Sequence, residues 1–387
     1  MSEGISRRGK NSWRIKFDLP RDPVTGERRT RYHTVRGTRK EAEAERIRLL
    51  HAAHKGNYVD PSKMTVAEFM EQWDRDWASA SNNLSPKTLE RYRQLIRLGI
   101  VPHIGSVKLQ QLKPLRLVEF YAKLSREGRE DGGGYAPRTV GQLHRVLYRA
   151  LGHAVRWGLV QQNVAAIVDP PKVEAAEIEI LTEDQIRAVL AALRATTSLY
   201  PLICLALATG MRRGELCALR WGDVDLEGGS LRVEQSLEQT AAGLRFKSPK
   251  TKHGRRSISL PAYAVAELKA HWANQNEKRL AMGLGKAPEG ALVFCHGDGE
   301  PLKPDNLSKE WRRLVKVRKL PRVTFHALRH THASQLIAAG VDVLTLSRRL
   351  GHGSPAITLG VYGHIFGDSD DKAARALEAA FQRAKTD

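Results

Sequence analysis

The 387-residue sequence contains few cysteines, and those few are widely separated. Cys204, Cys217 and Cys295 are its three cysteines, and no two of them form a CxxC pair. Such spacing supports neither a disulfide framework nor a zinc site built from thiolates. We therefore expect the chain to work in a reducing, intracellular compartment.

Long apolar runs and nucleotide-binding loops are also missing. No apolar stretch reaches the roughly 18 residues that a membrane-spanning helix needs, and the first twenty residues lack the apolar core of a secretion signal. The glycine-rich segment at residues 283–290 has neither a GKS or GKT ending nor a preceding strand. The sequence therefore predicts a cytoplasmic chain with no membrane partner and no ATP site.

Acidic residues are too few to balance the basic ones. The sequence has 63 Lys and Arg against 42 Asp and Glu, which gives a net charge of +21 and a pI near 10.1. Solubility alone does not require so large a charge, so the composition favours a polyanionic partner. With no membrane segment in view, we predict that this partner is nucleic acid.

The first 62 residues form a basic segment with a surplus of +7, from 15 Lys and Arg against 8 Asp and Glu. Residues 12–36 contain two runs of alternating apolar and basic positions around a turn, which predicts a β-hairpin. Thr38 and Glu41 then form a capping-box pattern that predicts a helix. Since a two-stranded ribbon can enter the major groove of DNA, we expect a DNA-binding module here; the alternative is an ordinary solvated surface.

The two faces of this hairpin are expected to have different roles. The apolar residues would pack on the following helix, and the basic ones would face a groove of DNA. The apolar set is Trp13, Phe17 and Tyr32, and the candidate DNA-binding set is Arg14, Lys16, Arg29 and Arg31.

The rest of the chain is predicted to be mainly helical. Helical patterns run from Thr65 onward, with Ser85 as a cap before Pro86, and an extended linker is expected at residues 165–180. Thr182 and Gln185 then predict a further helix start. Strands are expected within residues 230–238, 244–260 and 291–297, and an amphipathic helix with Ala374, Leu377, Ala380 and Phe381 on one stripe is expected at residues 369–387.

Two clusters of polar residues are candidates for chemistry. Arg212 and Glu215 are three positions apart, so the carboxylate can hold the guanidinium in one orientation where an apolar helix ends. His326 and Arg329 share one face of a predicted helix with Thr324 as its N-cap, which favours an anion. His330 also gives an HxxxH spacing, but the cation Arg329 opposes a metal ion there, so we favour a phosphate clamp over a metal site or core histidines.

A tyrosine hydroxyl close to two oriented arginines is a possible nucleophile toward a phosphodiester. Tyr362 follows His352 by ten residues near the end of the chain. At this point the sequence resembles the tyrosine recombinases, or phage-type integrases. The segments that carry the resemblance occur in the family's order: TGMRRGE with Arg212 and Glu215, PKTKHGRR with Lys250, HALRH with His326 and Arg329, LGHGS with His352, and VYGH with Tyr362.

The resemblance implies a fold of three domains. These are a small α+β arm-binding domain with three strands at residues 1–62, an all-α core-binding domain at residues 64–168, and a mainly α catalytic domain with a small antiparallel β-sheet at residues 174–387. Phe325 and His332 depart from the proline and the aromatic residue that are common in the family, but neither position is catalytic.

The resemblance also implies a role for each site residue. Arg212 and Arg329 would bind the scissile phosphate, with Glu215 supporting Arg212, and Tyr362 would attack to form a 3′-phosphotyrosine. Lys250, or alternatively Lys252, would protonate the leaving 5′ oxygen. His326 and His352 would donate hydrogen bonds or move the tyrosine proton.

No cofactor, neither ATP nor a metal ion, is implied by this chemistry, because the covalent link keeps the phosphodiester energy. The implied partners are double-stranded DNA at attachment sites, a homotetramer of the chain on DNA, and accessory DNA-bending proteins, in a bacterial or phage-infected cell. The C-terminal helix would pack on a neighbouring subunit. Two alternatives are a type IB topoisomerase-like activity that relaxes one duplex and a DNA-binding regulator without catalysis.

Overall fold

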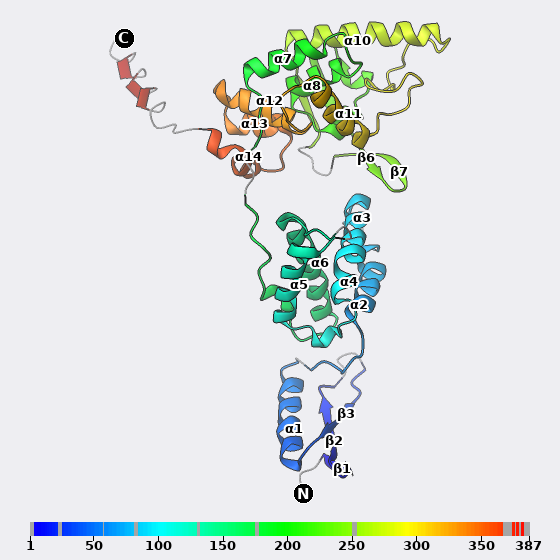
Figure 1. Ribbon diagram of the computed structural model, residues 1–387, viewed down its shortest axis with the longest axis vertical. Helices are drawn as coiled ribbons and strands as arrows, with labels where there is room; N and C mark the ends of the chain where they lie inside the picture. The colour runs from blue at the N-terminus through cyan, green and yellow to red at the C-terminus, as the bar shows by residue number, and fades with distance from the viewer. Residues whose placement is uncertain are drawn as a thin grey trace. The chain divides into compact units, whose positions relative to one another are not determined.

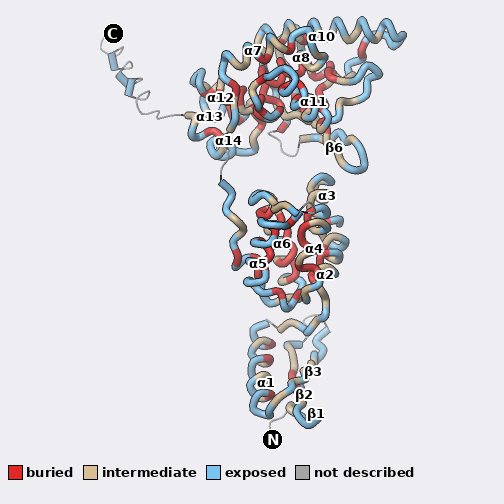
Figure 2. Tube along the Cα trace, in the orientation of Figure 1, coloured by how far each residue is buried: buried red, intermediate tan, exposed pale blue. Residues whose placement is uncertain are grey.

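The computed structural model describes residues 4–21, 25–56, 58–80, 84–129, 132–174, 178–249 and 254–366, together with 374–375, 377–378 and 381–382. The chain divides into two compact units, Met1–Ala175 and Ala176–Asp387 (Figure 1). Buried residues gather inside each unit (Figure 2). The first unit has separate hydrophobic clusters around Phe17 and around Trp73. This arrangement is consistent with three domains, and the division into three domains stays a prediction.

The first unit begins with a three-stranded antiparallel sheet in the order β1-β2-β3, followed by helix α1. The bounds are β1 Ile5–Gly9, β2 Ser12–Leu19, β3 Arg29–Arg36 and α1 Arg39–His54. The hairpin is therefore confirmed, and so is the capping box of Thr38 and Glu41 at the start of α1. Strand β1 is the third strand implied by the resemblance; its sequence ISRRG has one apolar residue and so no readable alternation.

The register of this sheet divides the basic residues differently from the prediction. Phe17 is buried, and Arg31 stands directly opposite it in the ladder between β2 and β3. Directly paired residues of an antiparallel ladder point to the same face. Arg31 and Arg29 therefore lie on the side that packs against α1, and only Arg14 and Lys16 of the predicted set lie on the open face.

Tyr32 is also placed differently from the prediction. It stands opposite Lys16 on the open face, is 54% exposed, and has the Cζ atom of Arg14 at 4.0 Å from its ring centroid. The expected packing of Tyr32 on α1 is therefore wrong. Phe17 does pack there, together with Ile15 and Leu49.

Helices form the rest of the first unit. They are α2 Val66–Trp73, α3 Pro86–Leu95, α4 Val101–Ile104, α5 Pro114–Glu127 and α6 Pro137–Arg156, with π-helical turns at Asp74–Ala78 and Ile96–Ile100. Ser85 caps α3 and Pro86 occupies its first turn, as predicted. Trp73 is fully buried among these helices, and its indole N–H donates to Nδ1 of His153 at 2.9 Å. The predicted linker at residues 165–180 begins later than expected, because Val164–Ala166 form a 3-10 helix with Ala165 buried. Residues 169–174 and 178–181 form no helix or strand.

The second unit is mainly helical, and its described residues include two small antiparallel sheets. The helices are α7 Glu183–Leu193, α8 Tyr200–Thr209, α9 Arg213–Leu216, α10 Ala262–Ala281, α11 Pro304–Val317, α12 Ala327–Ala338, α13 Val343–Leu350 and α14 Pro355–Tyr362. One sheet has the order β4-β5-β8, with β4 Val224–Asp225, β5 Ser230–Val233 and β8 Arg256–Ser259, and the other pairs β6 Ser236–Thr240 with β7 Gly243–Lys247.

Two sequence predictions in this unit have different outcomes. The helix start at Thr182 and Gln185 is confirmed as a complete capping box. The strand expected at residues 291–297 is wrong, because the segment makes only isolated bridges at Leu292 and Cys295. Ala291 and Val293 form backbone hydrogen bonds with Trp221 and Leu219, outside any strand, while Val293 and Phe294 fill the core.

The buried helix α8 organises the second unit around the candidate site. Nearly all of its residues are buried, and α12 packs along it. The end of α8 therefore meets the start of α12 and the loop after α13, although α8 is more than a hundred residues from both along the chain. Most of the C-terminal helix predicted at residues 369–387 lies outside the described residues.

Among the helices that the structure describes, none combines the length and the apolar character needed to cross a bilayer.

Candidate active site

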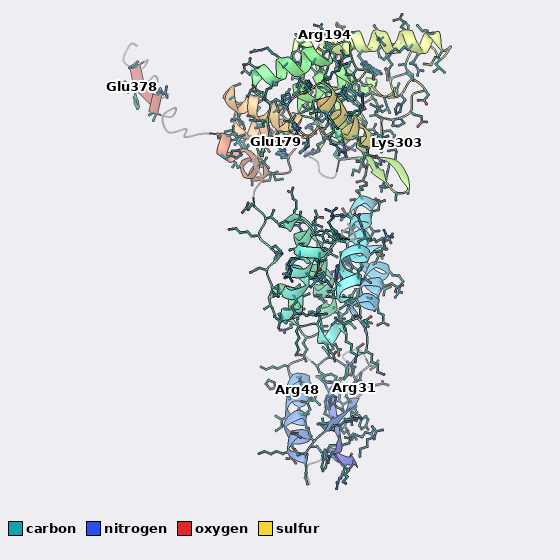
Figure 3. The ribbon with its side chains drawn as sticks, in the orientation of Figure 1. Arg31, Arg48, Glu179, Arg194, Lys303 and Glu378 are labelled. Carbon is teal, nitrogen blue, oxygen red and sulfur yellow. The ribbon has the colours of Figure 1, made fainter. Side chains whose placement is uncertain are left out.

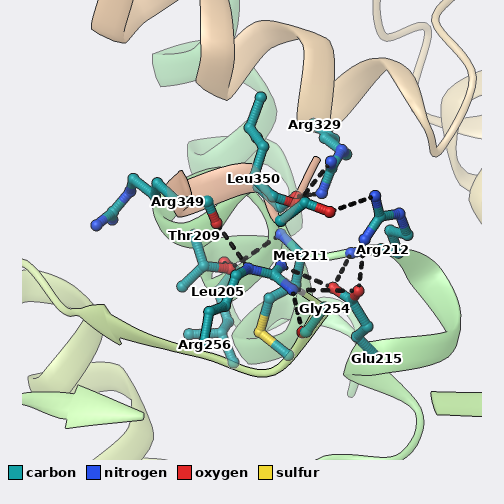
Figure 4. Close-up of polar contacts among 12 residues, drawn as sticks. Leu205, Thr209, Met211, Arg212, Glu215, Gly254, Arg256, Arg329, Arg349 and Leu350 are labelled. Carbon is teal, nitrogen blue, oxygen red and sulfur yellow. Dashed lines mark hydrogen bonds and ion pairs between the residues drawn. The ribbon is translucent and has the colours of Figure 1, made fainter. Parts of the chain in front are cut away.

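Arg212 is fixed at the start of the short helix α9 by Glu215. Its backbone N–H donates to Oε2 of Glu215 at 2.9 Å and its Nη1 donates to Oε1 at 2.9 Å, so the predicted pairing is confirmed (Figure 4). A third group also reaches this carboxylate, because Nη2 of Arg256 donates to Oε2 at 2.8 Å. Both Glu215 and the Arg256 side chain are buried, whereas the Arg212 side chain is 42% exposed.

The ionisation of Glu215 is secured by its two arginines. Burial by itself disfavours the carboxylate, but the hydrogen bonds and charge of Arg256, with the charge of Arg212, outweigh burial and hold the pKa of Glu215 below its ordinary value. Glu215 is therefore an anion that binds two cations, Arg212 and Arg256, and lies between them. The sequence analysis did not identify Arg256 as a site residue. The one feature of the sequence that could have indicated it is its place as the second arginine in PKTKHGRR.

Arg329 reaches the same region from the first turn of α12. Its Nη1 donates to the carbonyl of Gly210 at 2.7 Å and its Nη2 donates to the carbonyl of Leu350 at 2.8 Å, while the residue is 4% exposed (Figure 4). Nη2 of Arg212 donates to the next carbonyl, that of Gly351, at 3.1 Å. The two predicted clamp arginines are thus brought together on adjacent carbonyls of one loop.

Two glycines permit this close approach. Gly210 and Gly351 both have left-handed backbones, with φ values of 63° and 69°. A Cβ atom at Gly210 would come within 2.6 Å of the His332 ring, and one at Gly351 would come within 2.8 Å of Nη1 of Arg256. Both positions therefore need the conformational freedom and the small size of glycine.

The start of α12 differs slightly from the prediction. The helix begins at Ala327, so His326 holds the N-cap position, and the hydroxyl of Thr324 accepts from the N–H of Ala327 at 3.2 Å. His326 and Arg329 are near a helix N-terminus, as predicted. Partial desolvation of the His326 ring, together with the charges of His330 and Arg329, lowers the pKa of His326.

His352 follows the loop that receives the arginines. Its Nδ1 forms a 2.8 Å hydrogen bond with the hydroxyl of Thr358 in α14. Burial, with the charges of Arg329 and Arg212, lowers the pKa of His352 to about 4, so the ring is neutral at pH 7 when no anion is present.

Tyr362 is the last residue of α14 and is 1% exposed. Its hydroxyl forms a 2.8 Å hydrogen bond with Nδ1 of His330. Burial raises the pKa of Tyr362 to about 12, although the charge of Arg329 opposes the change. His330, which the sequence analysis weighed as part of a phosphate clamp, as a core histidine or as a metal ligand, therefore contacts the predicted nucleophile.

The electrostatics of these residues favour an anion. Arg212, Arg256 and Arg329 gather around one carboxylate, and burial together with Arg212 lowers the pKa of Arg329 to about 9, so it remains charged at pH 7. The charge of Arg329 also contributes to the lowered pKa values of His326, His330 and His352. A phosphate bound here would offset this excess of positive charge.

Lys250 and Lys252 lie outside the described residues. The described ends of their segment lie close together, because a Cβ atom at Gly254 would be 2.3 Å from Cβ of Pro249. The carbonyl of Gly254 in turn accepts from Nη1 of Arg256 at 3.2 Å. The described residues Pro249 and Gly254 therefore lie beside Arg256 of the arginine cluster, and the role of Lys250 stays a prediction.

Comparison with known proteins places these observations in a family. The model of the phage integrase family matches residues 179–367, and the model of the phage integrase N-terminal SAM-like domain matches residues 65–125. The chain belongs to the phage integrase family, the tyrosine recombinases.

Curated relatives match nearly the whole chain. A tyrosine recombinase XerC-like protein of Caldanaerobacter subterraneus subsp. tengcongensis is 29% identical, over 97% of this chain and 98% of its own length. An integrase of Streptomyces ambofaciens is also 29% identical, over 89% of this chain and 88% of its own length.

Solved structures show the same fold. The Tn1549 transposon integrase in complex with transposon right end DNA has a TM-score of 0.67 at 24% identity, over 82% of this chain and 99% of that one. A lambda integrase dimer bound to a COC′ core site has a TM-score of 0.59 at 20% identity, over 95% of each chain. The fold predicted from the sequence is therefore confirmed.

Proposed function

We propose that this chain is a site-specific DNA recombinase that cuts and rejoins strands through a 3′-phosphotyrosine and so integrates or excises a mobile DNA element. The observation that carries the proposal is the convergence of two arginines with a tyrosine. Arg329 and His330 are neighbours on α12. Arg329 and Arg212 donate to adjacent backbone carbonyls, and His330 contacts the hydroxyl of Tyr362.

The two arginines have donors to spare for a phosphate. A guanidinium has five N–H donors, and the contacts described above use one each on Nη1 and Nη2 of Arg212 and of Arg329. The remaining donors can bind the nonbridging oxygens of the scissile phosphate, where negative charge grows in the transition state. Glu215 and the loop carbonyls hold both groups in place before DNA arrives.

The chemical step exchanges one phosphoester for another. The oxygen of Tyr362 forms a bond to phosphorus and gives its proton to a histidine of the site, the bond from phosphorus to the 5′ oxygen breaks, and Lys250 supplies a proton to that oxygen. His352 and His326 would donate hydrogen bonds to the phosphate, since a bound anion raises a lowered histidine pKa. The new ester conserves the bond energy, so we propose that the step uses neither ATP nor a metal ion.

The proposed partner is double-stranded DNA that carries attachment sites. Several structural neighbours are DNA complexes, among them a lambda integrase tetramer bound to a Holliday junction, and we propose that this chain also works as a homotetramer, with accessory DNA-bending proteins as further partners. The open face of the N-terminal sheet, with Arg14 and Lys16, would hold a second, arm-type site. The reaction would take place in the cytoplasm of a bacterial cell.

The test of this function is the variant Tyr362→Phe on a nicked duplex whose sequence comes from the junctions of an element excised in cells that express the protein. The variant should bind this duplex with unchanged affinity but form no covalent protein–DNA adduct in denaturing gels, because only the attacking oxygen is lost. Adducts formed by Tyr362→Phe would show that another residue is the nucleophile. Relaxation of a supercoiled plasmid without strand exchange would instead support the topoisomerase-like alternative.

A further inference from the structure

The contact between His330 and Tyr362 has no role in the mechanism described so far. Nδ1 of His330 lies 2.8 Å from the hydroxyl of Tyr362, and the two rings are edge to face with centroids 5.6 Å apart. In the part of the chain that the structure describes, this is the one hydrogen bond of that hydroxyl. His330 is therefore the side chain best placed to affect the attacking oxygen directly.

The direction of this hydrogen bond follows from the burial of Tyr362. The tyrosine is 1% exposed, and its raised pKa of about 12 means that the hydroxyl carries its proton at pH 7. A buried hydroxyl proton needs an acceptor. If Nδ1 of His330 were the donor instead, the proton of the tyrosine would have no acceptor among the described residues, so the tyrosine donates to Nδ1.

The surroundings of His330 keep this nitrogen free to accept. Burial, and next the charge of Arg329, lower the pKa of His330 below its ordinary value of 6.5, so the ring is neutral at pH 7. The ionisable and charged groups that face it are His326 and Arg329 on its own helix, Tyr362 on α14, and His352 in the loop after α13. Of these groups, the charge of Arg329 disfavours a second proton on His330 in the free protein.

We propose that His330 is the general base of strand cleavage, taking the phenolic proton of Tyr362 on its Nδ1 as the tyrosine oxygen attacks phosphorus. As the bond from oxygen to phosphorus forms, the electron pair of the O–H bond stays on that oxygen, the proton moves to Nδ1, and the 5′ oxygen leaves with a proton from the general acid. In the religation step the same proton returns to the departing tyrosine oxygen. The bound phosphate offsets the positive charge that His330 gains.

The other two histidines of the site are less suited to this task. His352 uses its Nδ1 on the hydroxyl of Thr358 at 2.8 Å, which leaves Nε2 for a phosphate oxygen. His326 stacks edge to face on His330, with ring centroids 4.8 Å apart, and so lies one ring further from the tyrosine along this row. Both are placed to donate hydrogen bonds, whereas His330 is placed to accept a proton.

The first experiment compares His330→Asn with His330→Ala in single-turnover cleavage of the nicked junction duplex. The side-chain oxygen of asparagine can accept the tyrosine hydrogen bond in place of Nδ1, but it cannot hold a proton. General-base catalysis contributes roughly 10²–10⁴-fold, so both variants should cleave at least about 100-fold more slowly than the original protein. Cleavage by His330→Asn at the original rate would show that the contact only orients the tyrosine.

A second measurement isolates the proton transfer. Replacement of Tyr362 by a fluorinated tyrosine, whose phenol loses its proton more readily, should restore much of the rate of His330→Asn but not that of His326→Gln. Conversely, a 5′-bridging phosphorothiolate, whose leaving group needs no proton, should rescue Lys250→Ala but not His330→Asn. Absence of rescue by the fluorinated residue, or full rescue by the sulfur substrate, would overturn the assignment.

The pH profile supplies a readout that a packing defect would not change. Protonated His330 cannot accept, so cleavage by the original protein should fall as pH falls through the His330 pKa, which lies below 6.5. This acid limb should be weaker in His330→Asn. The matched control is His332→Asn, two positions away. The ring of His332 contacts the carbonyl of Leu207 and the guanidinium of Arg349, outside the reaction path. The control variant should be less stable but should keep the acid limb of the pH profile.

One further outcome would contradict the proposal. If the hydrogen bond instead stores the tyrosine in an inactive position, His330→Ala would cleave faster than the original protein. The proposal rests on Tyr362 as the nucleophile, and the two assignments can fail separately. Adducts formed by Tyr362→Phe would refute Tyr362 as the nucleophile. Undiminished cleavage by both His330 variants would refute only His330 as the general base.

Discussion

The basic residues of the candidate active site in the second unit and those of the N-terminal sheet are held in opposite ways. Arg329 is 4% exposed, and both of its terminal nitrogens donate to backbone carbonyls. Arg14 and Lys16 are exposed on the open face of β2, where Arg14 lies over the ring of Tyr32. Figure 3 shows the side chains of both units, with Arg31 labelled on the sheet.

This contrast separates two uses of positive charge. Groups that stabilise a transition state act best when they are oriented in advance, since they then need no reorganisation during the reaction. Groups that neutralise the phosphates of a duplex need only be near it, because their effect is mainly the release of counterions. The same change of arginine to lysine should therefore have very different effects in the two regions.

The largest expected effect is at Arg329. Arg329→Lys keeps the charge, but an ammonium cannot serve the carbonyls of Gly210 and Leu350 and also two phosphate oxygens. Loss of one oriented donor typically costs about 10²–10³-fold, so single-turnover cleavage should fall by at least this factor. Arg14→Lys is the matched control and should leave cleavage unchanged. Equal effects of the two changes would remove the distinction between the regions.

The next effect concerns Glu215, the carboxylate that spaces the arginines. Glu215→Gln leaves Arg212 and Arg256 without their anion in a buried setting, which costs about 3–5 kcal/mol of unfolding free energy. Urea denaturation should show this loss, and added phosphate should recover part of it. Glu310→Gln, which breaks an exposed pair with Arg313, should change stability by less than about 1 kcal/mol.

The stability that Glu215 contributes depends on pH in a defined direction. Its folded-state pKa lies below the ordinary value of 4.5, so the contribution is fully present above that value and is lost as pH falls through the lower, folded value. The stability gap between the original protein and Glu215→Gln should therefore stay constant from about pH 5 to 8 and narrow only in acid. A gap that narrows near neutral pH would contradict this account.

The sequence predicted the parts of the site that depend on local spacing. Arg212 with Glu215, and His326 with Arg329, are three positions apart, so helical geometry fixes their relation. Arg256 and the carbonyls of Gly210 and Leu350 come from segments separated by up to about 140 positions, and only the packing of α12 on α8 joins them. The spacing of residues within one segment cannot predict contacts between segments so far apart in the sequence.

The errors in the sequence reading have a similar origin. The faces of the N-terminal hairpin depend on which residue of β3 stands opposite Phe17, and a shift of one residue reverses every side chain. The turn between β2 and β3 did not fix that register by its sequence, so Arg29, Arg31 and Tyr32 were assigned to the wrong side. His330 was identified by its spacing from His326, yet its contact is with Tyr362, 32 positions away.

A smaller effect is expected at the glycine that carries the arginine-binding loop. Gly351→Ala and Gly340→Ala both place a side chain on a left-handed backbone, at a cost of roughly 1–2 kcal/mol each. Only at Gly351 would the new Cβ press on Arg256; at Gly340 it meets no atom within 4 Å. Both variants should lose similar stability, but only Gly351→Ala should cleave more slowly, by about tenfold if the transition state loses roughly 1.4 kcal/mol.

The smallest effect should appear on the N-terminal sheet, where it shows which face meets DNA. Lys16 lies on the open face, whereas Arg31 lies on the other face and forms an ion pair with Asp60 at 2.7 Å. Each phosphate contact adds about 0.9 to the magnitude of the slope of log K against log salt. Lys16→Ala should therefore reduce that slope by about this amount on DNA that carries an arm-type site, while Arg31→Ala should leave it unchanged and lower stability by less than about 1 kcal/mol. Titrations at several salt concentrations measure both slopes. The opposite result, a reduced slope for Arg31→Ala alone, would mean that the helix side of the sheet meets the duplex.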